Sequence, residues 1–510
     1  MLAPYSTRFA AEAVVSTVDQ IAAQAGIEAL RAGGCAVDAA IAAGAVLAVT
    51  QEHQCGLGGD LWALVHRPGE EVPHALNAAG RAGSGADPER LRAAGHERMP
   101  ADRDSGCAPV PGCVDGWLAL HERFARLPLA DLLAPARAHA AGGFAASEAL
   151  AAAAPLLAGV AHADDFTAAG PLVAGQIVRR PGVARALEAI TREGRRGFYE
   201  GEFGDALLRH GGGEYTAADL ARPQADWVAP LGIDAFGARL WSPPPSSQGY
   251  LTLRSAAIAS SLDLPDPRDA EWAHLLIESA RAAGVDRDLT WHEAADGPAL
   301  IAPEAIRAMR ERVSARAGRD AAPPVRGGTV SLCVVDRNRM AVSMLQSVFT
   351  AWGSLRFLPG VGVGLHNRGS CFSLAAGHPA EYGPGRRPPH TLAPALVTSV
   401  DGSPAMVVAT RGGHIQPQVV LQLLARVSAG AQTPAEAMAA GRWALSADGV
   451  LLEGQCPGDW VRGLTARGHG VERRPQFDDD FGHAQMIVCH DDHLAAASDP
   501  RSLTCGVGAL

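Results

Sequence analysis

The N-terminal region begins with two segments whose apolar residues follow a helical pattern. Between residues 20 and 34 apolar side chains recur at helical spacing and stop at the glycine pair 33–34, which predicts the end of a helix there. Residues 36–50 continue as a helix of small apolar residues, and such a helix has to pack closely against its neighbours. Residues 55–69 change to a glycine turn followed by a strand.

The middle of the chain is predicted to be mainly helical. Residues 115–210 contain Ala-rich amphipathic segments, and residues 270–317 again favour helix. Between them, residues 215–260 indicate short strands and a turn at Pro-Pro-Pro-Ser-Ser-Gln-Gly. The segment 318–328 is rich in Gly, Pro and Arg, which predicts a mobile loop.

A β-hairpin is predicted directly after this loop. Residues 329–336 alternate apolar and polar side chains as a strand does, residues 337–339 form a turn, and residues 340–350 form a second strand. Later segments indicate strands at 395–400, 405–410 and 484–490 and helices at 415–428 and 434–441. Because both parts of the chain mix sheet and helix, the pattern favours a layered α/β architecture.

Composition narrows the possible chemistry. All 44 basic residues are arginine, since the chain contains no lysine. A lysine Schiff base, a Walker A phosphate loop and a Ser–Lys dyad are therefore excluded. The net charge of −10 argues against nucleic acid and anionic membranes, so we expect neither as a partner.

Cysteine usage and the N-terminal residues indicate the compartment. The nine cysteines form no Cys-x-x-Cys pair, so we expect buried thiols in a reducing compartment and neither a disulfide framework nor a zinc ribbon. The N-terminal residues lack the basic and apolar regions of a secretory signal, and no apolar run reaches the ~18 residues of a membrane span. The sequence thus predicts a soluble cytoplasmic protein.

Metal and cofactor motifs are weak. The histidines between residues 366 and 414 lack the spacing of metal motifs, and the cluster 490–493 is better explained as a charged turn between strands. The glycine-rich residues 56–60 precede a strand and lack the third glycine of a dinucleotide site. We therefore predict no metal and no cofactor.

Thr329 is a candidate nucleophile because of its position after Gly327 and Gly328. A threonine needs a base within hydrogen-bond reach, and at a chain N-terminus its own α-amine supplies one. An internal threonine reaches that state only if the peptide bond before it is cut, and flexible glycines suit such a cut. The alternative is that Thr329 simply opens a strand after a loop.

Several blocks of the sequence resemble the gamma-glutamyltransferases, in the same order. They are AAQAGIEALRAGGCAVDAAIAAGAVLAVTQEHQCGLGGD (22–60), VPGCVDGWLALHERFARLPLADLLAPA (110–136), EGRRGFYEGEFGDAL (193–207), PPPSSQG (243–249), GGTVSLCVVDRNRMAVSMLQSVF (327–349), RRPPHTLAPALV (386–397) and ATRGGHIQPQ (409–418). The resemblance covers nearly the whole chain.

This resemblance implies a fold, a cleavage and part of a catalytic site. The fold is the α+β, four-layer αββα sandwich of the N-terminal-nucleophile hydrolases, with a helix-rich N-terminal part. Autocatalytic cleavage between Gly328 and Thr329 would yield fragments 1–328 and 329–510, which stay together as a heterodimer forming one integrated domain. Ser347 falls where the family carries a hydroxyl that supports the nucleophile. The pair Gly412–Gly413 falls on the glycines whose N–H groups form the oxyanion hole.

The chain departs from the family where the substrate's amino group is bound. In LHNRGSCFSL (365–374), Ser370 and Cys371 replace two acids, and Phe349 replaces a second-strand asparagine. An ammonium bound there would be desolvated without a charge partner. We therefore expect an acid substrate that lacks the amine.

Other departures concern the residues that bind the substrate's carboxylate in the family. The family's arginine position is Ala79 here, so Arg81 or Arg368 is a candidate to bind a carboxylate, although either arginine is equally compatible with a surface role. His390 and Thr391 stand where the family has a serine pair that contacts the substrate. His390 is thus a candidate ligand for an acid, or a buried histidine bonded to a backbone carbonyl.

The sequence favours one function and leaves rivals open. It resembles the amidohydrolase branch that includes oxamate amidohydrolase-like proteins, and it indicates hydrolysis or transfer of an acyl group from a small carboxylated amide through an acyl-threonine. The rivals are Thr-dependent C–C bond hydrolysis in a natural-product pathway, true gamma-glutamyl transfer or hydrolysis, and a non-catalytic, uncleaved homologue.

Overall fold

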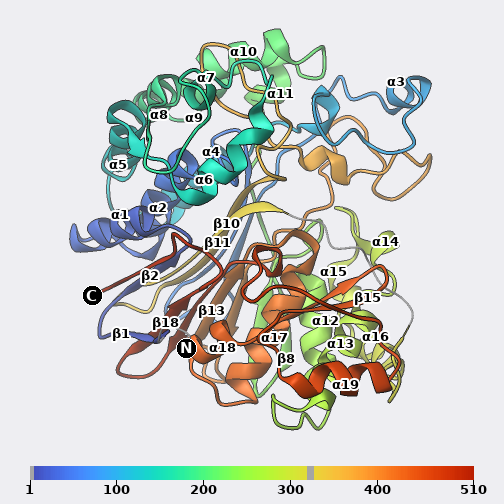
Figure 1. Ribbon diagram of the computed structural model, residues 1–510. Coiled ribbons are helices and arrows are strands. Elements are labelled where there is room, and N and C mark those ends of the chain that lie inside the picture. The colour runs from blue at the N-terminus through green and yellow to red at the C-terminus, as the bar shows by residue number, and fades with distance from the viewer. Residues whose placement is uncertain (1–4, 319–326) are drawn as a thin grey trace.

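Two antiparallel sheets of seven strands each form the centre of the molecule (Figure 1). The computed structural model describes residues 5–318 and 327–510. Sheet A has the order β1 (Arg8–Ala10), β18 (Leu494–Ser498), β17 (Ala484–Cys489), β13 (Pro404–Thr410), β12 (Ala395–Thr398), β9 (Ala238–Ser242) and β8 (Leu231–Ala235). Sheet B has the order β19 (Gly506–Ala509), β2 (Val14–Thr17), β10 (Gly328–Val335), β11 (Ala341–Phe349), β3 (Asp60–His66), β4 (His74–Ala78) and β7 (Asp226–Val228).

The two sheets pack face to face, and helices cover both outer faces. Apolar side chains of both sheets, such as Leu64, Leu345, Val407 and Ile487, form one buried cluster between them. The helices that share a core with sheet B are α1 (Gln20–Arg31), α2 (Ala36–Thr50), α4 (Cys113–Phe124), α5 (Leu129–Gly142) and α8 (Pro181–Glu193). Those that share a core with sheet A are α12 (Gly249–Ser260), α13 (Ala270–Ala283), α17 (Gln416–Ser428) and α19 (Gly458–Ala466). This arrangement confirms the four-layer αββα sandwich of the α+β class.

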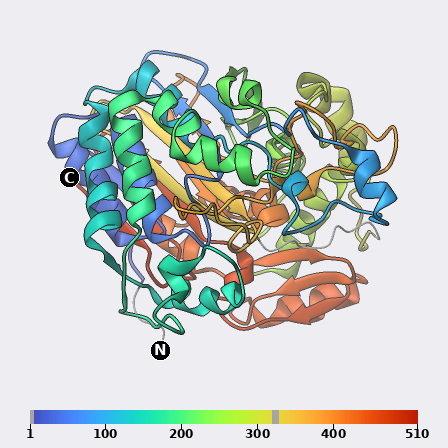
Figure 2. The same ribbon diagram turned by 90° about the horizontal axis from the view of Figure 1, so that it is seen from above.

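Shorter elements complete the fold around these layers. The remaining helices are α3 (Pro88–Ala93), α6 (Glu148–Ala153), α7 (Asp164–Thr167), α9 (Arg195–Tyr199), α10 (Glu202–His210), α11 (Ala217–Ala221), α14 (Arg287–Thr290), α15 (Gly297–Leu300), α16 (Pro303–Arg310) and α18 (Pro434–Ala439). Small sheets pair β5 (Phe144–Ala145) with β6 (Ile177–Val178), and β14 (Trp443–Ser446) with β15 (Gly449–Leu452) and β16 (Val471–Arg473). Seen from above, cyan and green helices lie beside the yellow hairpin strands (Figure 2).

Local sequence signals account for the elements that carry the site. Helix α1 ends at Arg31, and Gly33 adopts φ = 95°, which agrees with the predicted glycine stop. All residues of α2 are buried, and a Cβ on Gly44 would lie only 2.9 Å from the Met344 side chain of β11. The small residues of α2 thus allow this helix to pack directly on β11, which pairs with the strand that contains Thr329.

One predicted region differs from the structure. Residues 249–260 form helix α12, where short strands were expected. This helix is buried on nearly every side, between sheet A and other helices, so its sequence has no polar stripe to show a helical period. Residues 319–326, within the predicted mobile loop, lie outside the described residues.

No helix in residues 5–318 and 327–510 has both the length and the apolar character needed to cross a lipid bilayer.

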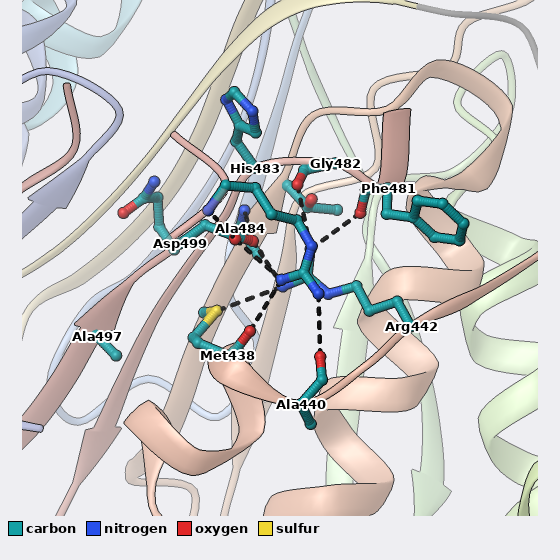
Figure 3. A network of polar contacts seen from close by, with 12 residues as sticks. Met438, Ala440, Arg442, Phe481, Gly482, His483, Ala484, Ala497 and Asp499 are labelled. Carbon is teal, nitrogen blue, oxygen red and sulfur yellow. Dashed lines mark hydrogen bonds and ion pairs between the residues drawn. The ribbon is translucent and has the colours of Figure 1, made fainter. Parts of the chain in front are cut away.

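A buried ionic network fixes the turn beside the end of β13 (Figure 3). The Arg442 guanidinium donates to Phe481 O at 2.9 Å, to Gly482 O at 3.1 Å and to the Asp499 carboxylate at 2.6 Å. Asp499 also accepts the N–H of Ala484 at 2.8 Å. Since Arg442 and Asp499 are almost completely buried, the network holds residues 481–484 in one conformation.

The same turn contacts two segments that lead to the site. His483 O accepts the hydroxyl of Ser331 on β10 at 2.9 Å and the N–H of Arg411 at 3.2 Å. Arg411 directly precedes Gly412 and Gly413. The network therefore helps to fix the position of the loop formed by Gly412 and Gly413.

Candidate active site

Three neighbouring strands of sheet B place Thr329, Ser347 and Asp60 in one row. Thr329 lies opposite Ser347 in the β10–β11 pair, and Ser347 lies opposite Asp60 in the β11–β3 pair. Directly opposed residues of antiparallel strands project from the same face, so the three polar side chains lie side by side. Each is at most 1% exposed. The row combines two hydroxyls and a carboxylate in a buried environment.

The hydrogen bonds of Ser347 define the direction of proton donation. Its Oγ lies 2.9 Å from Thr329 Oγ1 and 2.7 Å from Gly328 O. Because Gly328 O only accepts and Ser347 carries one hydroxyl proton, Ser347 donates to Gly328 O and Thr329 donates to Ser347. The N–H of Phe349 at 2.8 Å and Nη2 of Arg368 at 3.1 Å also point at the Ser347 oxygen. Ser347 thus links the Thr329 hydroxyl to the carbonyl of the peptide bond that precedes it.

Asp60 is the centre of a buried charge cluster. Arg368 donates to both of its oxygens, at 2.9 and 3.3 Å, and His390 Nε2 lies 2.9 Å and His366 Nδ1 3.3 Å from Oδ2. Burial alone would raise the pKa of Asp60, but the charge of Arg368 and the hydrogen bonds of the histidines hold this pKa well below its usual range. Asp60 is therefore a carboxylate at neutral pH.

His390 is neutral in this cluster. Burial, followed by the charge of Arg368, lowers the pKa of His390 to about 4. Its Nδ1 accepts the N–H of Leu392 at 3.2 Å, so its proton is on Nε2 and is donated to Asp60. His390 consequently orients Asp60 without adding a charge.

Arg368 is enclosed by partners from the protein itself. It is completely buried and makes four hydrogen bonds, two to Asp60, one to Thr391 Oγ1 at 2.8 Å and one to Ser347. Its guanidinium also lies 4.4 Å from the centre of the Phe349 ring. These bonds use four of its five N–H groups. The structure thereby brings together Arg368, Phe349, Thr391, His390 and Ser347 from the sequence prediction.

Gly412 and Gly413 form a loop that leads into helix α17. Their φ values of 130° and 58° lie in the region that favours glycine. Neither N–H donates a hydrogen bond within the described parts of the chain. A Cβ on Gly327 would lie 2.9 Å from Gly413 N, so the segment before Thr329 passes directly over this amide. Two free N–H groups at a helix start are suited to bind an oxyanion.

Gln248 ties the glycine loop to the segment around His390. Its Nε2 donates to Gly413 O and to Thr391 O, both at 2.8 Å. Its backbone N–H donates to His390 O at 2.9 Å. Gln248 is completely buried, and it therefore fixes two parts of the site relative to each other.

Two predicted site residues make their contacts elsewhere. Arg81 forms ion pairs with Asp226 at 3.0 Å and with Glu293 at 3.7 Å. Ser370 donates to Asn367 O at 2.7 Å. In residues 5–318 and 327–510, neither side chain is hydrogen-bonded to the row of Thr329, Ser347 and Asp60, so any role in substrate binding stays a prediction.

Sequence reasoning did not single out Asp60 or Gln248. Both lie inside blocks that carried the family resemblance, at the ends of Gly-Leu-Gly-Gly-Asp and Pro-Pro-Pro-Ser-Ser-Gln. The sequence does contain one signal for Asp60, because an acidic residue at the start of a hydrophobic strand is unusual. No local pattern marks Gln248, because the two carbonyls that accept from its side-chain amide are more than 100 residues away in sequence.

One group of possible metal ligands occurs in the described chain, and it lies apart from this site. It consists of the buried residues His274, Glu278 and His469. His274 Nδ1 and His469 Nε2 are 2.8 Å apart, and Glu278 is bonded to Arg281 at 3.1 Å and to the N–H of Gly318 at 2.9 Å. These side chains thus already have partners within the protein.

Known proteins share this fold and sequence over almost the whole chain. The chain is 32% identical to the glutathione hydrolase-like YwrD proenzyme of Bacillus subtilis, over 96% of its length and 97% of that protein. It is also 32% identical to the oxamate amidohydrolase proenzyme of Klebsiella pneumoniae, with 96% and 97% covered.

A solved structure and a family model agree with these relatives. The structure of a cephalosporin acylase from Bacillus halodurans superposes with a TM-score of 0.93 at 30% identity, covering 100% of this chain and 98% of the acylase. The sequence model of the gamma-glutamyltranspeptidase family matches residues 22–508. The chain therefore belongs to the gamma-glutamyltranspeptidase family, and it is an N-terminal-nucleophile enzyme of the hydrolase and acyltransferase type.

Proposed function

We propose that the chain cuts itself between Gly328 and Thr329 and that the freed Thr329 hydrolyses an amide of a small carboxylated compound. The observation that carries the proposal is the contact of Ser347 Oγ with both Thr329 Oγ1, at 2.9 Å, and Gly328 O, at 2.7 Å. One hydroxyl thus contacts the attacking group and the carbonyl that is attacked.

The cleavage step follows from this geometry. Thr329 Oγ1 attacks the Gly328 carbonyl carbon, and the Ser347 hydroxyl donates to the oxygen that becomes negative. The proton of Oγ1 passes to the Thr329 nitrogen as the C–N bond breaks, which frees the α-amine of Thr329 and leaves Gly328 as an ester on Oγ1. Water then hydrolyses the ester and releases the Gly328 carboxylate and the Thr329 hydroxyl. That the relatives are named proenzymes supports such a maturation step.

The mature site repeats the same chemistry on a substrate. The Thr329 amine takes the Oγ1 proton, Oγ1 attacks the acyl carbon, and the N–H groups of Gly412 and Gly413 stabilise the oxyanion. The proton passes to the departing amine as the C–N bond breaks, and water completes hydrolysis of the acyl-threonine.

Both proposed fragments contribute strands to both sheets. Strand β10 of fragment 329–510 lies between β2 of fragment 1–328 and β11. Sheet A likewise joins β12 and β13 to β9 and β8 of the first fragment. We therefore propose that cleavage leaves an integrated heterodimer that separates only on unfolding.

The substrate proposal rests on charge. The acids that would bind a substrate's ammonium are replaced by Ser370 and Cys371, and burial raises the pKa of the Cys371 thiol to about 11. The one carboxylate in the row, Asp60, is occupied by Arg368. An acyl group that carries a carboxylate but no ammonium suits this environment. The names of the relatives, which include an oxamate amidohydrolase and an acylase, favour amides over C–C bonds.

Intact-mass spectrometry with N-terminal sequencing tests the maturation. We expect fragments that begin at Met1 and Thr329, a single chain for Thr329→Ala, and retained cleavage for Thr329→Ser, which keeps the hydroxyl. Two fragments from Thr329→Ala, or an active protein that remains continuous through position 329, would overturn the mechanism. A wild-type chain that is never cleaved would instead favour the non-catalytic alternative.

Activity assays test the substrate class. We expect faster hydrolysis of glutaryl p-nitroanilide than of gamma-glutamyl p-nitroanilide, which differs by the α-amine. The reverse order would favour true gamma-glutamyl chemistry. If neither anilide releases its amine while a ketone substrate is cleaved, C–C hydrolysis replaces the proposal.

A further inference from the structure

The arginines around the site differ in whether an acid neutralises them. Four have a carboxylate partner: Arg368 with Asp60, Arg81 with Asp226, Arg387 with Asp226, and Arg411 with Asp479. Arg287, on the short helix α14, is different. In residues 5–318 and 327–510 no carboxylate oxygen lies within 4.0 Å of its guanidinium nitrogens.

The partners of Arg287 are all uncharged. Its Nη2 donates to Gln248 Oε1 at 2.9 Å, and its Nη1 lies 2.7 Å from His414 Nδ1. Because a guanidinium only donates, His414 Nδ1 accepts and carries no proton. Burial and the charges of Arg287 and Arg368 hold the pKa of His414 well below its usual range. No acid in direct contact with the guanidinium therefore compensates the charge of Arg287 in the described residues.

The acids nearest in sequence do not neutralise it either. Asp286 is bonded to Arg254 at 2.6 Å, and Asp288 is exposed and makes no ion pair with Arg287 in the described structure. The guanidinium instead lies 4.2 Å from the centre of the Trp291 ring, and its buried Nε has no hydrogen-bond partner in the described residues. A buried, unpaired donor on a cation is a free binding position for an anion.

Arg287 is also close to the catalytic groups. Gln248, which accepts from Arg287, donates to Gly413 O, so one side chain separates the guanidinium from the proposed oxyanion loop. His414 follows Gly413 directly, and Trp291 donates to His390 O at 3.1 Å. The cation thus borders the site on the side of the glycine loop.

We propose that Arg287 binds a carboxylate of the substrate, which makes the preferred substrate the monoamide of a dicarboxylic acid. The inference rests on the proposed function, since it places the second acid of the acyl group opposite the amide that Thr329 attacks. Arg368 already binds the carboxylate of Asp60 and makes four hydrogen bonds within the protein, and Arg81 is neutralised by Asp226. Of these three arginines, Arg287 is the one without an acidic partner in the described residues. Its planar guanidinium matches the geometry of a carboxylate.

The test compares acids with matched neutral compounds. The substrates are glutaryl p-nitroanilide and its methyl ester, and the variants are Arg287→Gln, Arg287→Lys and Arg81→Gln. Arg196→Gln on α9 is the control, because Arg196 is exposed and remote in sequence from the site. We expect Arg287→Gln to lower kcat/KM about 10- to 100-fold for the acid and less than about 3-fold for the ester. Arg287→Lys should recover part of the loss, and Arg81→Gln should lose less than Arg287→Gln.

A binding measurement separates this inference from the proposed function. Isothermal titration with glutarate needs no catalysis, because glutarate contains no amide. Equal losses for acid and ester in Arg287→Gln, or unchanged glutarate binding, would overturn the role of Arg287 while amide hydrolysis by Thr329 stands. If no amide is hydrolysed but Arg287→Gln abolishes glutarate binding, the carboxylate site stands and the proposed function fails. If neither anilide is hydrolysed and glutarate does not bind, both fail.

Discussion

Replacement of Asp60 by asparagine tests whether the buried charge cluster organises the row of active-site residues. Asp60 and Arg368 are both completely buried, and Asp60 accepts two hydrogen bonds from the guanidinium. Asparagine keeps the size but removes the charge, and its amide group can accept from Arg368 through one oxygen only. Arg368 then remains as a buried cation without an acid. Breaking a buried pair in this way destabilises a protein by about 3–5 kcal/mol.

The matched control is Asp226→Asn. Asp226 also pairs with two arginines, Arg81 at 3.0 Å and Arg387 at 2.8 Å, but its side chain is 50% exposed. Solvent screens this pair, so we expect a loss of less than about 1 kcal/mol. Both changes are made in the Thr329→Ala background, so that each protein unfolds as one chain. Urea unfolding then gives the difference in unfolding free energy.

The effect of Asp60→Asn depends on pH in a predictable direction. The folded pKa of Asp60 lies well below the unfolded value of about 3.9, so its charge stabilises the folded state above that pH. This contribution is lost as the pH falls from the unfolded pKa towards the folded pKa. The difference in unfolding free energy between the proteins with and without Asp60→Asn should therefore be constant from about pH 6 to 8 and shrink below about pH 4. A loss no larger than that of Asp226→Asn, or a difference independent of pH, would refute the reasoning.

Three further predictions concern neighbouring groups. Ser347→Ala removes the hydroxyl that donates to Gly328 O, so self-cleavage followed on a denaturing gel should slow about 100-fold. The control is Ser343→Ala on the same strand, which removes a hydrogen bond to Val408 O and should cleave normally. Gly412→Pro removes an N–H and forbids φ = 130°, so turnover should fall at least about 100-fold, whereas Gly237→Pro, equally strained at φ = 76° in the turn between β8 and β9, should keep turnover per folded molecule. Arg442→Met removes the 2.6 Å bond to Asp499 and should lower the free energy of unfolding, measured by urea denaturation, by about 3–5 kcal/mol. The control is Arg239→Met at an exposed pair with Asp234, which should change this free energy by less than about 1 kcal/mol. Equal losses in the two variants would contradict the role of the buried network.

Local patterns in the sequence determined the hairpin and the helices next to the site. The alternation after Gly328 predicted strands that the structure places at β10 and β11, and the glycine pair after Arg31 predicted the end of α1. Periodicity suffices there because each strand or helix presents one consistent face to the core. It failed at α12, where burial on nearly all sides removes the polar face that reveals a period.

The sequence also identified some of the active-site residues. Thr329, Ser347 and the glycine loop stand in blocks whose order and spacing resemble the family, so the sequence alone identifies them as candidates. The sequence also identifies Arg368, but as a ligand for substrate and not as the partner of a buried acid.

Only the tertiary structure decided which distant residues share the site. Strand β10 pairs with β2 and β11 pairs with β3, although β2 and β3 lie about 300 residues earlier in the chain. That register puts Asp60 beside Ser347, and the packing of α12 and α14 brings Gln248 and Arg287 to the glycine loop. Such contacts depend on how whole layers stack, and no local spacing encodes them. The charge balance of the site, with one cation neutralised by Asp60 and another left unpaired, is therefore a property of the folded chain.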